Sequence, residues 1–355
     1  MVNKQKRSIK ILMSGNEAIA EGALQAGCSF YAGYPITPQN ELIAYMSVHL
    51  QAKGGVFIQA ESEVAAINMV FGASAAGARA MTSSSSPGIS LKQEGISYIA
   101  GAELPAVVVN IMRGGPGLGN IWPGQADYFQ ATRAGGNGDY HCIVLAPASV
   151  QECFDIMKNA FDLADKYRNP VMVLGDGMLG QMMEPVECRN TKAGNKMPVK
   201  PWALSGCAGR RHNVVKSFYI LEGDLERFNL KLQEKYKAIQ KKEERWEEFM
   251  VQDAKLVLVA YGSMARIACS AVKALRVKGK KVGLIRPITL WPFPRQAFAK
   301  AKDRYLAVEM SYGQMVEDVR LALDGRAIVE FLGRSGGGIP AEEEIIARAR
   351  KLYHG

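Results

Sequence analysis

The chain has 355 residues, 48% hydrophobic and 22% charged, which is the composition of an ordinary globular protein. No apolar run approaches the roughly 18 residues of a membrane span, and the apolar part of the basic N-terminal segment is too short for a signal peptide, so we expect a cytoplasmic protein without a membrane span. Much of the net charge of +10 falls in residues 189–250, where cations alternate with acids as on a solvated helix. Nucleic-acid binding is therefore not expected, and a basic face for an acidic protein or an anionic cofactor fits better.

The first half of the chain alternates predicted helices and strands. Strands with continuous apolar character indicate a parallel sheet covered by helices on both faces. Helices are expected at 16–27, 39–51, 62–78, 89–102 and 149–167, and strands at 29–33, 56–60, 80–83, 106–112, 142–146 and 171–175.

A second alternating block begins at residue 255. Strands are expected at 255–263, 281–285, 304–310 and 327–333, with helices at 264–279 and after Pro340. Between the two blocks lies a segment that mixes Pro, Gly and Lys and then forms a long charged helix. We therefore expect three parts, namely a domain at 1–186, a charged and partly helical linker at 187–252, and a second domain at 253–355.

Unusual residues follow four successive strands of the first block. Because ligands bind at the carboxyl ends of strands in open α/β sheets, these residues are candidates for one site. They are Thr37, Glu61, Glu63, Ser83 to Ser86, and Arg113.

The stretch "YAGYPITPQN" holds a threonine between two prolines. Pro35 and Pro38 each fix their own φ angle and disfavour helix at the preceding residue. We expect Thr37 to be rigid and exposed, at the mouth of a helix that begins near Pro38.

Two charged candidates have both functional and structural interpretations. Arg113 follows an apolar strand and precedes glycines, which suits bidentate recognition of a carboxylate or phosphate, although it could equally pair with a nearby acid. Glu61 and Glu63 stand where acids complement a helix dipole. The small residues that follow them can bring another backbone close enough to bury one carboxylate, and a buried carboxyl group with a raised pKa can exchange a proton with a ligand.

Three further motifs are weaker. "SSSSPG" is equally consistent with an anion-binding helix N-terminus and with a capped turn, and "RGGPGLGN" matches no nucleotide-binding fingerprint. "GDGML" is similar to the metal-diphosphate motif of thiamine diphosphate enzymes but lacks the later asparagine, so Asp176 is expected to be a turn or cap residue. The six cysteines are scattered, and we expect neither a metal nor an iron–sulfur cluster on this chain.

Several motifs agree in order and spacing with one known family. At "GYPITPQNE", "QAESEVAAINMVFGASAAGARAMTSSSSPGISL" and "IMRGGPG" the chain resembles the α subunit of 2-oxoacid:ferredoxin oxidoreductases. The run "SSSSPGISLKQEGISYIAGAELP" is most similar to the branched-chain type, which acts on 3-methyl-2-oxobutanoate. "RPITLWPFP" and "AVEMSYGQMVEDV" resemble the transketolase C-terminal-like domain of the same subunit.

The resemblance implies a fold and a reaction. The fold would be a pyrimidine-binding domain of thiamine diphosphate enzymes, with a doubly wound parallel sheet, followed by a transketolase C-terminal-like α/β domain. The reaction would convert a 2-oxo acid to acyl-CoA and CO2 and reduce ferredoxin, with coenzyme A as cosubstrate. Thiamine diphosphate would be shared with a diphosphate-binding β subunit, with Mg2+ and [4Fe-4S] clusters on partner subunits. A γ subunit and a ferredoxin-like iron–sulfur subunit would complete the complex.

Roles for single residues are also implied by the resemblance. Thr37 and Arg113 would bind the substrate carboxylate. Glu63 would contact the aminopyrimidine ring of the cofactor, and Glu61 has no catalytic role in this interpretation. Tyr34 and Pro35 would line the cofactor site, as would the site-shaping residues Gly33 and Gly114. Trp122 and Tyr128 are expected either to wall the substrate pocket or to pack against a partner.

Other functions remain open at this point. The same machinery could act on 2-oxoglutarate, pyruvate or an aryl 2-oxo acid. The chain could also be a non-catalytic assembly subunit, although the joint presence of Thr37, Glu63 and Arg113 argues against it. A stand-alone NAD dehydrogenase lacks support because no dinucleotide fingerprint is present.

Overall fold

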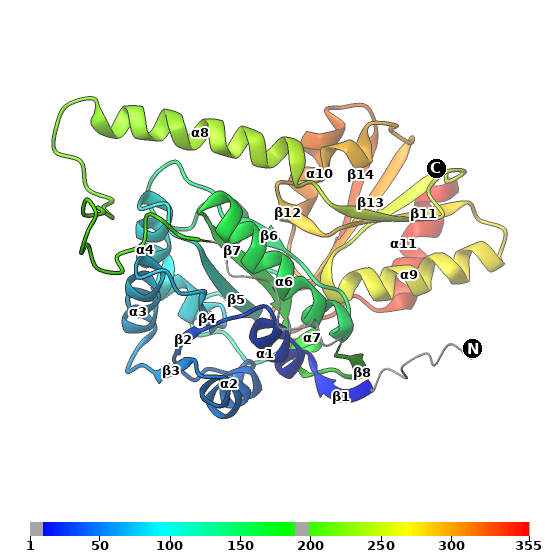
Figure 1. Cartoon of the computed structure of the whole chain (residues 1–355). Coiled ribbons are helices and arrows are strands. Elements are labelled where there is room, and N and C mark those ends of the chain that lie inside the picture. Colours follow the sequence, from blue (N-terminus) through cyan, green and yellow to red (C-terminus); the bar gives the residue numbers. More distant parts are fainter. Residues whose placement is uncertain (1–9, 189–198, 355) are drawn as a thin grey trace, which may run out of the picture.

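The computed structural model describes residues 10–188 and 199–354, and two parallel-stranded sheets dominate it (Figure 1). The first sheet has seven strands, and all pair in parallel except β12, which is antiparallel to β6. Their order is β12 (Thr289–Trp291), β6 (Ile143–Leu145), β7 (Pro170–Asp176), β5 (Ala106–Met112), β4 (Ala80–Ser84), β2 (Phe30–Gly33) and β3 (Val56–Gln59). The predicted α/β class with a parallel sheet is confirmed.

Helices cover both faces of this sheet (Figure 1). One face carries α1 (Gly15–Gln25), α2 (Asn40–Ala52) and α6 (Val150–Tyr167), and the other carries α3 (Glu63–Ala75) and α4 (Pro87–Gly101). Burial on both faces explains why the central strands β4, β5 and β7 are buried at every position. The short helices α5 (Tyr128–Thr132) and α7 (Gly177–Gln181) lie in the connections.

The second sheet has five strands. Its order is β14 (Ile328–Gly333), β13 (Arg304–Glu309), β10 (Leu256–Val259), β11 (Val282–Pro287) and β9 (Trp246–Phe249), with only β9 antiparallel to its neighbour. Helices α9 (Gly262–Val277) and α11 (Glu342–His354) pack together beside it, and α10 (Met315–Leu323) and the 3-10 helix Arg295–Phe298 complete this half.

Four short strands that pair in antiparallel fashion were absent from the sequence prediction. β1 (Lys10–Ser14) pairs with β8 (Met183–Glu187). β9 falls within the expected linker yet joins the second sheet, and β12 comes from the second half of the chain yet joins the first sheet. The second half of the chain therefore contributes an edge strand, β12, to the first sheet.

Serine side chains cap the N-termini of several of the described helices. Ser14 forms a capping box with Glu17 at the start of α1, and Ser62 accepts a hydrogen bond from the backbone N–H of Ala65 in α3. Such caps satisfy N–H groups that have no partner within the helix. The cap at Ser62 fixes Glu63 as the first residue of α3.

The expected charged helix is α8 (Asp224–Lys242), which extends along the first domain (Figure 1). Its cations Lys231 and Lys235 both pair with Glu103. Before α8, the chain is held by the buried side chain of Lys200, whose Nζ lies 2.8 Å from Asp165 and donates to the carbonyl of Ala78.

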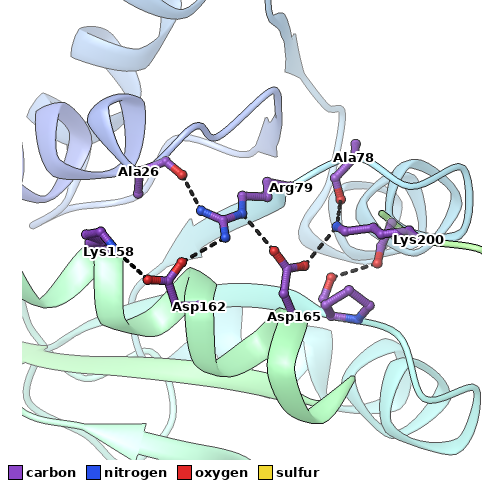
Figure 2. A network of polar contacts seen from close by, with 9 residues as sticks. Ala26, Ala78, Arg79, Lys158, Asp162, Asp165 and Lys200 are labelled. Atoms are coloured by element: carbon purple, nitrogen blue, oxygen red, sulfur yellow. Dashed lines mark hydrogen bonds and ion pairs between the residues drawn. The ribbon is translucent and has the colours of Figure 1, made fainter. Parts of the chain in front are cut away.

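Figure 2 shows how this anchor continues into the domain. Asp165 also accepts a hydrogen bond from Arg79, whose other guanidinium nitrogens donate to Asp162 and to the carbonyl of Ala26. The network therefore ties the segment after residue 199 to α6 and to the amino end of β4. No helix in the described part of the chain is long and apolar enough to cross a membrane.

Candidate active site

The loops at the carboxyl ends of β2, β3, β4 and β5 meet at one edge of the first sheet. Thr37 follows β2, Glu63 begins the helix after β3, the serine run ends β4, and Arg113 follows β5 directly. Since these four strands are neighbours in the sheet, their loops adjoin in space. The predicted convergence at this edge is therefore present in the structure.

Arg113 links two of these loops. Its Nη1 donates to the backbone carbonyl of Thr37 and its Nη2 to that of Leu118, each at 2.9 Å. The residue is 6% exposed, and its Nε–H is buried without a hydrogen-bond partner. It forms no ion pair with a carboxylate among the described residues. A buried, unpaired guanidinium is costly, so the anion it suits is one that arrives from outside.

Thr37 lies in a tight turn rather than at the first turn of a helix. The N–H of Gln39 donates to the carbonyl of Ile36, and the peptide between Thr37 and Pro38 is cis. Helix α2 begins at Asn40, one residue after the expected start at Gln39 and two after Pro38, because the turn occupies this stretch. Contrary to the expected exposure, the side chain of Thr37 is half-buried. Its hydroxyl accepts a 3.3 Å hydrogen bond from Asn40.

Glu63 is the buried carboxylate of the pair, at 6% exposed, whereas Glu61 is exposed and precedes the helix. The expectation that one of the two would be buried is confirmed. Glycine at position 88 makes room for it, because a Cβ there would lie 2.6 Å from Glu63 Oε1 and 2.0 Å from Ser84 Oγ. The backbone that comes close to the Glu63 carboxyl group is therefore that of the first turn of α4.

The serine run has divided roles. Ser83 is fully engaged, since its hydroxyl bonds both Tyr31 and Gln39 at 2.6 Å. Ser86 bonds Asp127 at 2.6 Å and accepts from the backbone N–H of Arg113. The hydroxyls of Ser84 and Ser85 are fully buried and have no partner. Ser86 does not cap α4 through its side chain, so the capped-turn interpretation fails at this residue.

Sequence reasoning did not identify Asp127. Its half-buried carboxylate accepts hydrogen bonds from Ser86 and from Asn110, at 2.6 and 2.9 Å. Burial raises the pKa of Asp127, and the hydrogen bonds and the charge of Arg113 oppose that shift. Asp127 supports Ser86 and hence the backbone of Arg113. It lies in an aperiodic loop, "GNIWPGQADYF", which carries no pattern that would mark it.

The remaining predicted residues surround this centre. Tyr34 and Pro35 are exposed on the loop after β2, and a Cβ at Gly33 would lie 2.4 Å from the Tyr31 hydroxyl. Gly114 closes the loop after β5 through a hydrogen bond to the Trp122 carbonyl.

Two of the remaining candidates join the halves of the chain. Asp176 is a helix cap, as expected. It caps α7 through Leu179 and accepts from the N–H and hydroxyl of Ser263 in the second domain. Tyr128 is fully buried and donates to Asp318 at 2.6 Å, so it packs between the two halves rather than lining a pocket. Trp122 is 63% exposed.

The residues present fit a thiamine-type ring at this edge. The carboxyl group of Glu63 and the Ser84 hydroxyl both lie close to the bare Cα of Gly88, and the buried hydroxyls of Ser84 and Ser85 have no partner among the described residues. A carboxyl group can exchange a proton with a ring nitrogen, and a guanidinium group can bind a carboxylate. Among the described residues, no three His, Cys, Asp or Glu side chains gather closely enough to hold a metal ion.

Two family models match nearly the whole chain. The model described as pyruvate flavodoxin/ferredoxin oxidoreductase, thiamine diphosphate-binding, matches residues 21–245. The model described as pyruvate:ferredoxin oxidoreductase core domain II matches residues 254–345. The first covers the edge that carries Thr37, Glu63 and Arg113.

Curated relatives match over full length. The ketoisovalerate oxidoreductase subunit VorB of Methanothermobacter marburgensis is 51% identical over 344 residues, covering 96% of this chain and 97% of the relative. The 2-oxoglutarate synthase subunit KorA of Methanothermobacter thermautotrophicus is 37% identical over 369 residues, covering 96% and 98%.

Solved structures agree in fold. The 2-oxoglutarate:ferredoxin oxidoreductase from Magnetococcus marinus, with 2-oxoglutarate, coenzyme A and succinyl-CoA bound, matches with a TM-score of 0.85 and 29% identity over 98% of this chain and 66% of that chain. An inactive tetramer of a split-gene transketolase matches in fold alone, with a TM-score of 0.60 and 14% identity over 98% and 99%.

Proposed function

Because this chain belongs to the 2-oxoacid:ferredoxin oxidoreductase family, we propose that it is the catalytic α subunit of a multi-subunit enzyme. The enzyme oxidatively decarboxylates a branched-chain 2-oxo acid, 3-methyl-2-oxobutanoate, to acyl-CoA and CO2 and reduces ferredoxin. The choice of substrate is supported by the higher identity to a ketoisovalerate oxidoreductase subunit than to a 2-oxoglutarate synthase subunit, 51% against 37%.

The observation that carries the proposal is the buried guanidinium of Arg113, which has no ion-pair partner among the described residues, at the same edge of the sheet as the buried carboxyl group of Glu63. Arg113 and Thr37 bind the substrate carboxylate, and the hydrogen bond between them fixes their separation. Holding the carboxylate in one orientation favours loss of CO2, since positional freedom would forfeit rate.

Thiamine diphosphate supplies the carbanion chemistry when it is bound. Glu63 holds a proton at the pyrimidine ring nitrogen, and α3 presents the carboxyl group at its first residue. Ser84 and Ser85 add buried hydroxyls that have no partner among the described residues. Gly33, Gly114, Tyr34 and Pro35 shape the mouth of the site.

The partner proteins carry the rest of the machinery. In this proposal a β subunit holds the diphosphate and Mg2+, and an iron–sulfur subunit passes electrons to ferredoxin. A γ subunit completes the complex, and coenzyme A accepts the acyl group. The domain at 1–186 provides the pyrimidine half of the site, and the domain at 253–355 supports it through contacts such as that between Asp176 and Ser263.

The proposal is tested on the complex purified through a tag on this chain. Anaerobic, coenzyme A-dependent viologen reduction is measured with a panel of 2-oxo acids. We expect the highest kcat/KM with 3-methyl-2-oxobutanoate. A higher kcat/KM with 2-oxoglutarate, pyruvate or an aryl 2-oxo acid would support the same type of reaction with a different substrate.

The variant Glu63→Gln separates a catalytic subunit from an assembly subunit. Loss of a positioned proton-transfer group costs about 10²- to 10⁴-fold in rate, so we expect activity to fall by that amount while the complex stays assembled. Glu61→Gln is the matched control, because Glu61 is exposed and outside the helix. Full activity of Glu63→Gln would show that the chain is a scaffold.

A further inference from the structure

A group of apolar side chains is exposed just before α8 and along its first turns. Five residues within 13 positions form the apolar surface, and they are between 49% and 82% exposed: Phe218, Ile220, Leu221, Leu225 and Leu230. Leu225 and Leu230 also line a groove of about 700 Å³ between α8 and the loop that precedes β6. Single exposed apolar residues are ordinary on a protein surface, but a patch of them marks an interaction site.

The chain that carries the apolar surface is fixed against the first domain. Tyr219 stacks on Phe228 of α8 with ring centroids 5.1 Å apart, and Phe228 packs against the buried core. On α8 itself, Leu232 and Tyr236 are buried. The stack at Tyr219 holds the segment around Ile220 alongside the helix, so the apolar side chains of both belong to one surface. Burying these exposed side chains against a partner would be favourable.

The same part of the chain is basic. Residues 199–242 contain ten Lys and Arg but only four Asp and Glu, in a chain whose net charge is +10. Arg211, Lys216 and Lys241 are exposed and form no ion pair among the described residues. A positive field on a protein surface attracts an acidic partner and speeds its association.

Charge and apolar character together select the kind of partner. In a symmetric pair of this chain the surface would face its own cations, and like charges across an interface cost free energy. A nucleic acid binds mainly through its phosphates, which would match the cations but not the apolar residues. A protein interface has an apolar centre and a polar rim. An acidic protein with an apolar contact patch therefore matches both features.

We propose that the apolar surface is the docking site of an acidic partner subunit. Apolar side chains of that subunit cover Ile220 and Leu221, and its carboxylates face cations such as Lys216. The inference rests on the multi-subunit complex of the proposed function, and not on the chemistry of the active site.

The test measures how fast each partner subunit leaves the complex. The complex is immobilised through a tag on this chain and washed, and the subunits that remain are followed over time by quantitative mass spectrometry. Burying such an apolar side chain contributes at least about tenfold to a binding constant, and interface substitutions act mostly on the dissociation rate. Ile220→Ser should therefore release one partner subunit at least about tenfold faster.

Val277→Ser is the matched control for the loss of an exposed apolar side chain. Val277 is the last residue of α9 in the second domain and is 89% exposed. This variant should release every subunit at the wild-type rate. Because Ile220 and Val277 are both exposed, both variants should keep the wild-type melting temperature.

A pair of charge reversals tests the acidic character of the partner. Lys216→Glu should slow rebinding of the released subunit, and the difference from wild type should shrink as salt is raised. Lys278→Glu is the matched control, because it changes the net charge equally at an exposed lysine of the second domain. It should rebind the subunit at close to the wild-type rate.

Each other outcome contradicts one part of the account. Wild-type release of every partner subunit by Ile220→Ser would overturn the docking site and leave the proposed function intact. Faster release of a second copy of this chain, or nucleic acid that copurifies with wild type and is lost from Lys216→Glu, would overturn the acidic subunit as the occupant. Equal slowing by Lys216→Glu and Lys278→Glu would overturn the charge match. A wild-type complex inactive on every 2-oxo acid would overturn the proposed function alone, since subunit release does not depend on turnover.

Discussion

Two buried arginines lie at opposite ends of adjacent strands in the first sheet and differ in their hydrogen-bond partners. Arg79 directly precedes β4 and Arg113 directly follows the adjacent strand β5; they are 9% and 6% exposed. Every guanidinium nitrogen of Arg79 has a partner, and two of these partners are the carboxylates of Asp162 and Asp165 (Figure 2). Among the described residues, the guanidinium group of Arg113 donates to two backbone carbonyls, and its Nε–H has no partner.

The difference separates a structural charge from a functional one. A buried charge is tolerated when it is paired and hydrogen-bonded, and Arg79 meets that condition within the chain. Arg113 meets it only in part, and in the proposed function an anionic substrate completes its environment. The two ends of β4 differ in the same way. At its amino end, every guanidinium nitrogen of Arg79 has a partner. At its carboxyl end, the hydroxyls of Ser84 and Ser85 have no partner among the described residues.

The largest effect is expected for Arg79→Met. Removing one partner of a buried ion pair costs about 3–5 kcal/mol. We expect a loss near the lower end of this range, because Asp165 stays buried at 8% exposed but keeps its pair with Lys200. Chemical denaturation of the chain should report this loss. Activity per folded complex should stay at the wild-type level, and a specific loss of kcat would contradict the structural role.

Arg113→Gln is expected to have a smaller effect, and to lower activity rather than stability. Truncating one partner of a buried, hydrogen-bonded charge pair costs about 2–5 kcal/mol, which here falls on the substrate complex, so kcat/KM should drop about a hundredfold. Stability should change little, because Arg113 has no carboxylate partner among the described residues. A loss of stability without a change in kcat/KM per folded complex would show that Arg113, like Arg79, has a structural role.

The smallest effect is a dependence on pH. Burial opposes ionisation of Asp162, but hydrogen bonds from Lys158 and Arg79 prevail and hold its pKa below the usual 3.8. A lowered pKa contributes stability above the usual pKa, and this contribution is lost as the pH falls through the folded value. The stability gap between wild type and Arg79→Met should therefore be constant at neutral pH and narrow below about pH 4. A gap that widens in acid would contradict the pairing.

The sequence predicted the elements that have strong periodicity and the residues that follow them. Apolar runs located the central strands, and strand-end reasoning together with the family resemblance selected Thr37, Glu63 and Arg113. β9 and β12 were not predicted because each has only a few residues and pairs with a strand far away along the chain. The full burial of Lys92 in α4 was not predicted, because a lysine in a helix is ordinarily solvent-exposed.

The most direct test of the site is its discrimination between a 2-oxo acid and the corresponding uncharged amide. Dissociation constants for 3-methyl-2-oxobutanoate and its amide are measured on the cofactor-loaded complex, for wild type, Arg113→Gln and the control Arg79→Gln. A hydrogen bond to a charged group contributes about 1.5–3 kcal/mol, so wild type and Arg79→Gln should prefer the acid at least about tenfold. Arg113→Gln should lose that preference. An undiminished preference in Arg113→Gln would contradict carboxylate binding by Arg113.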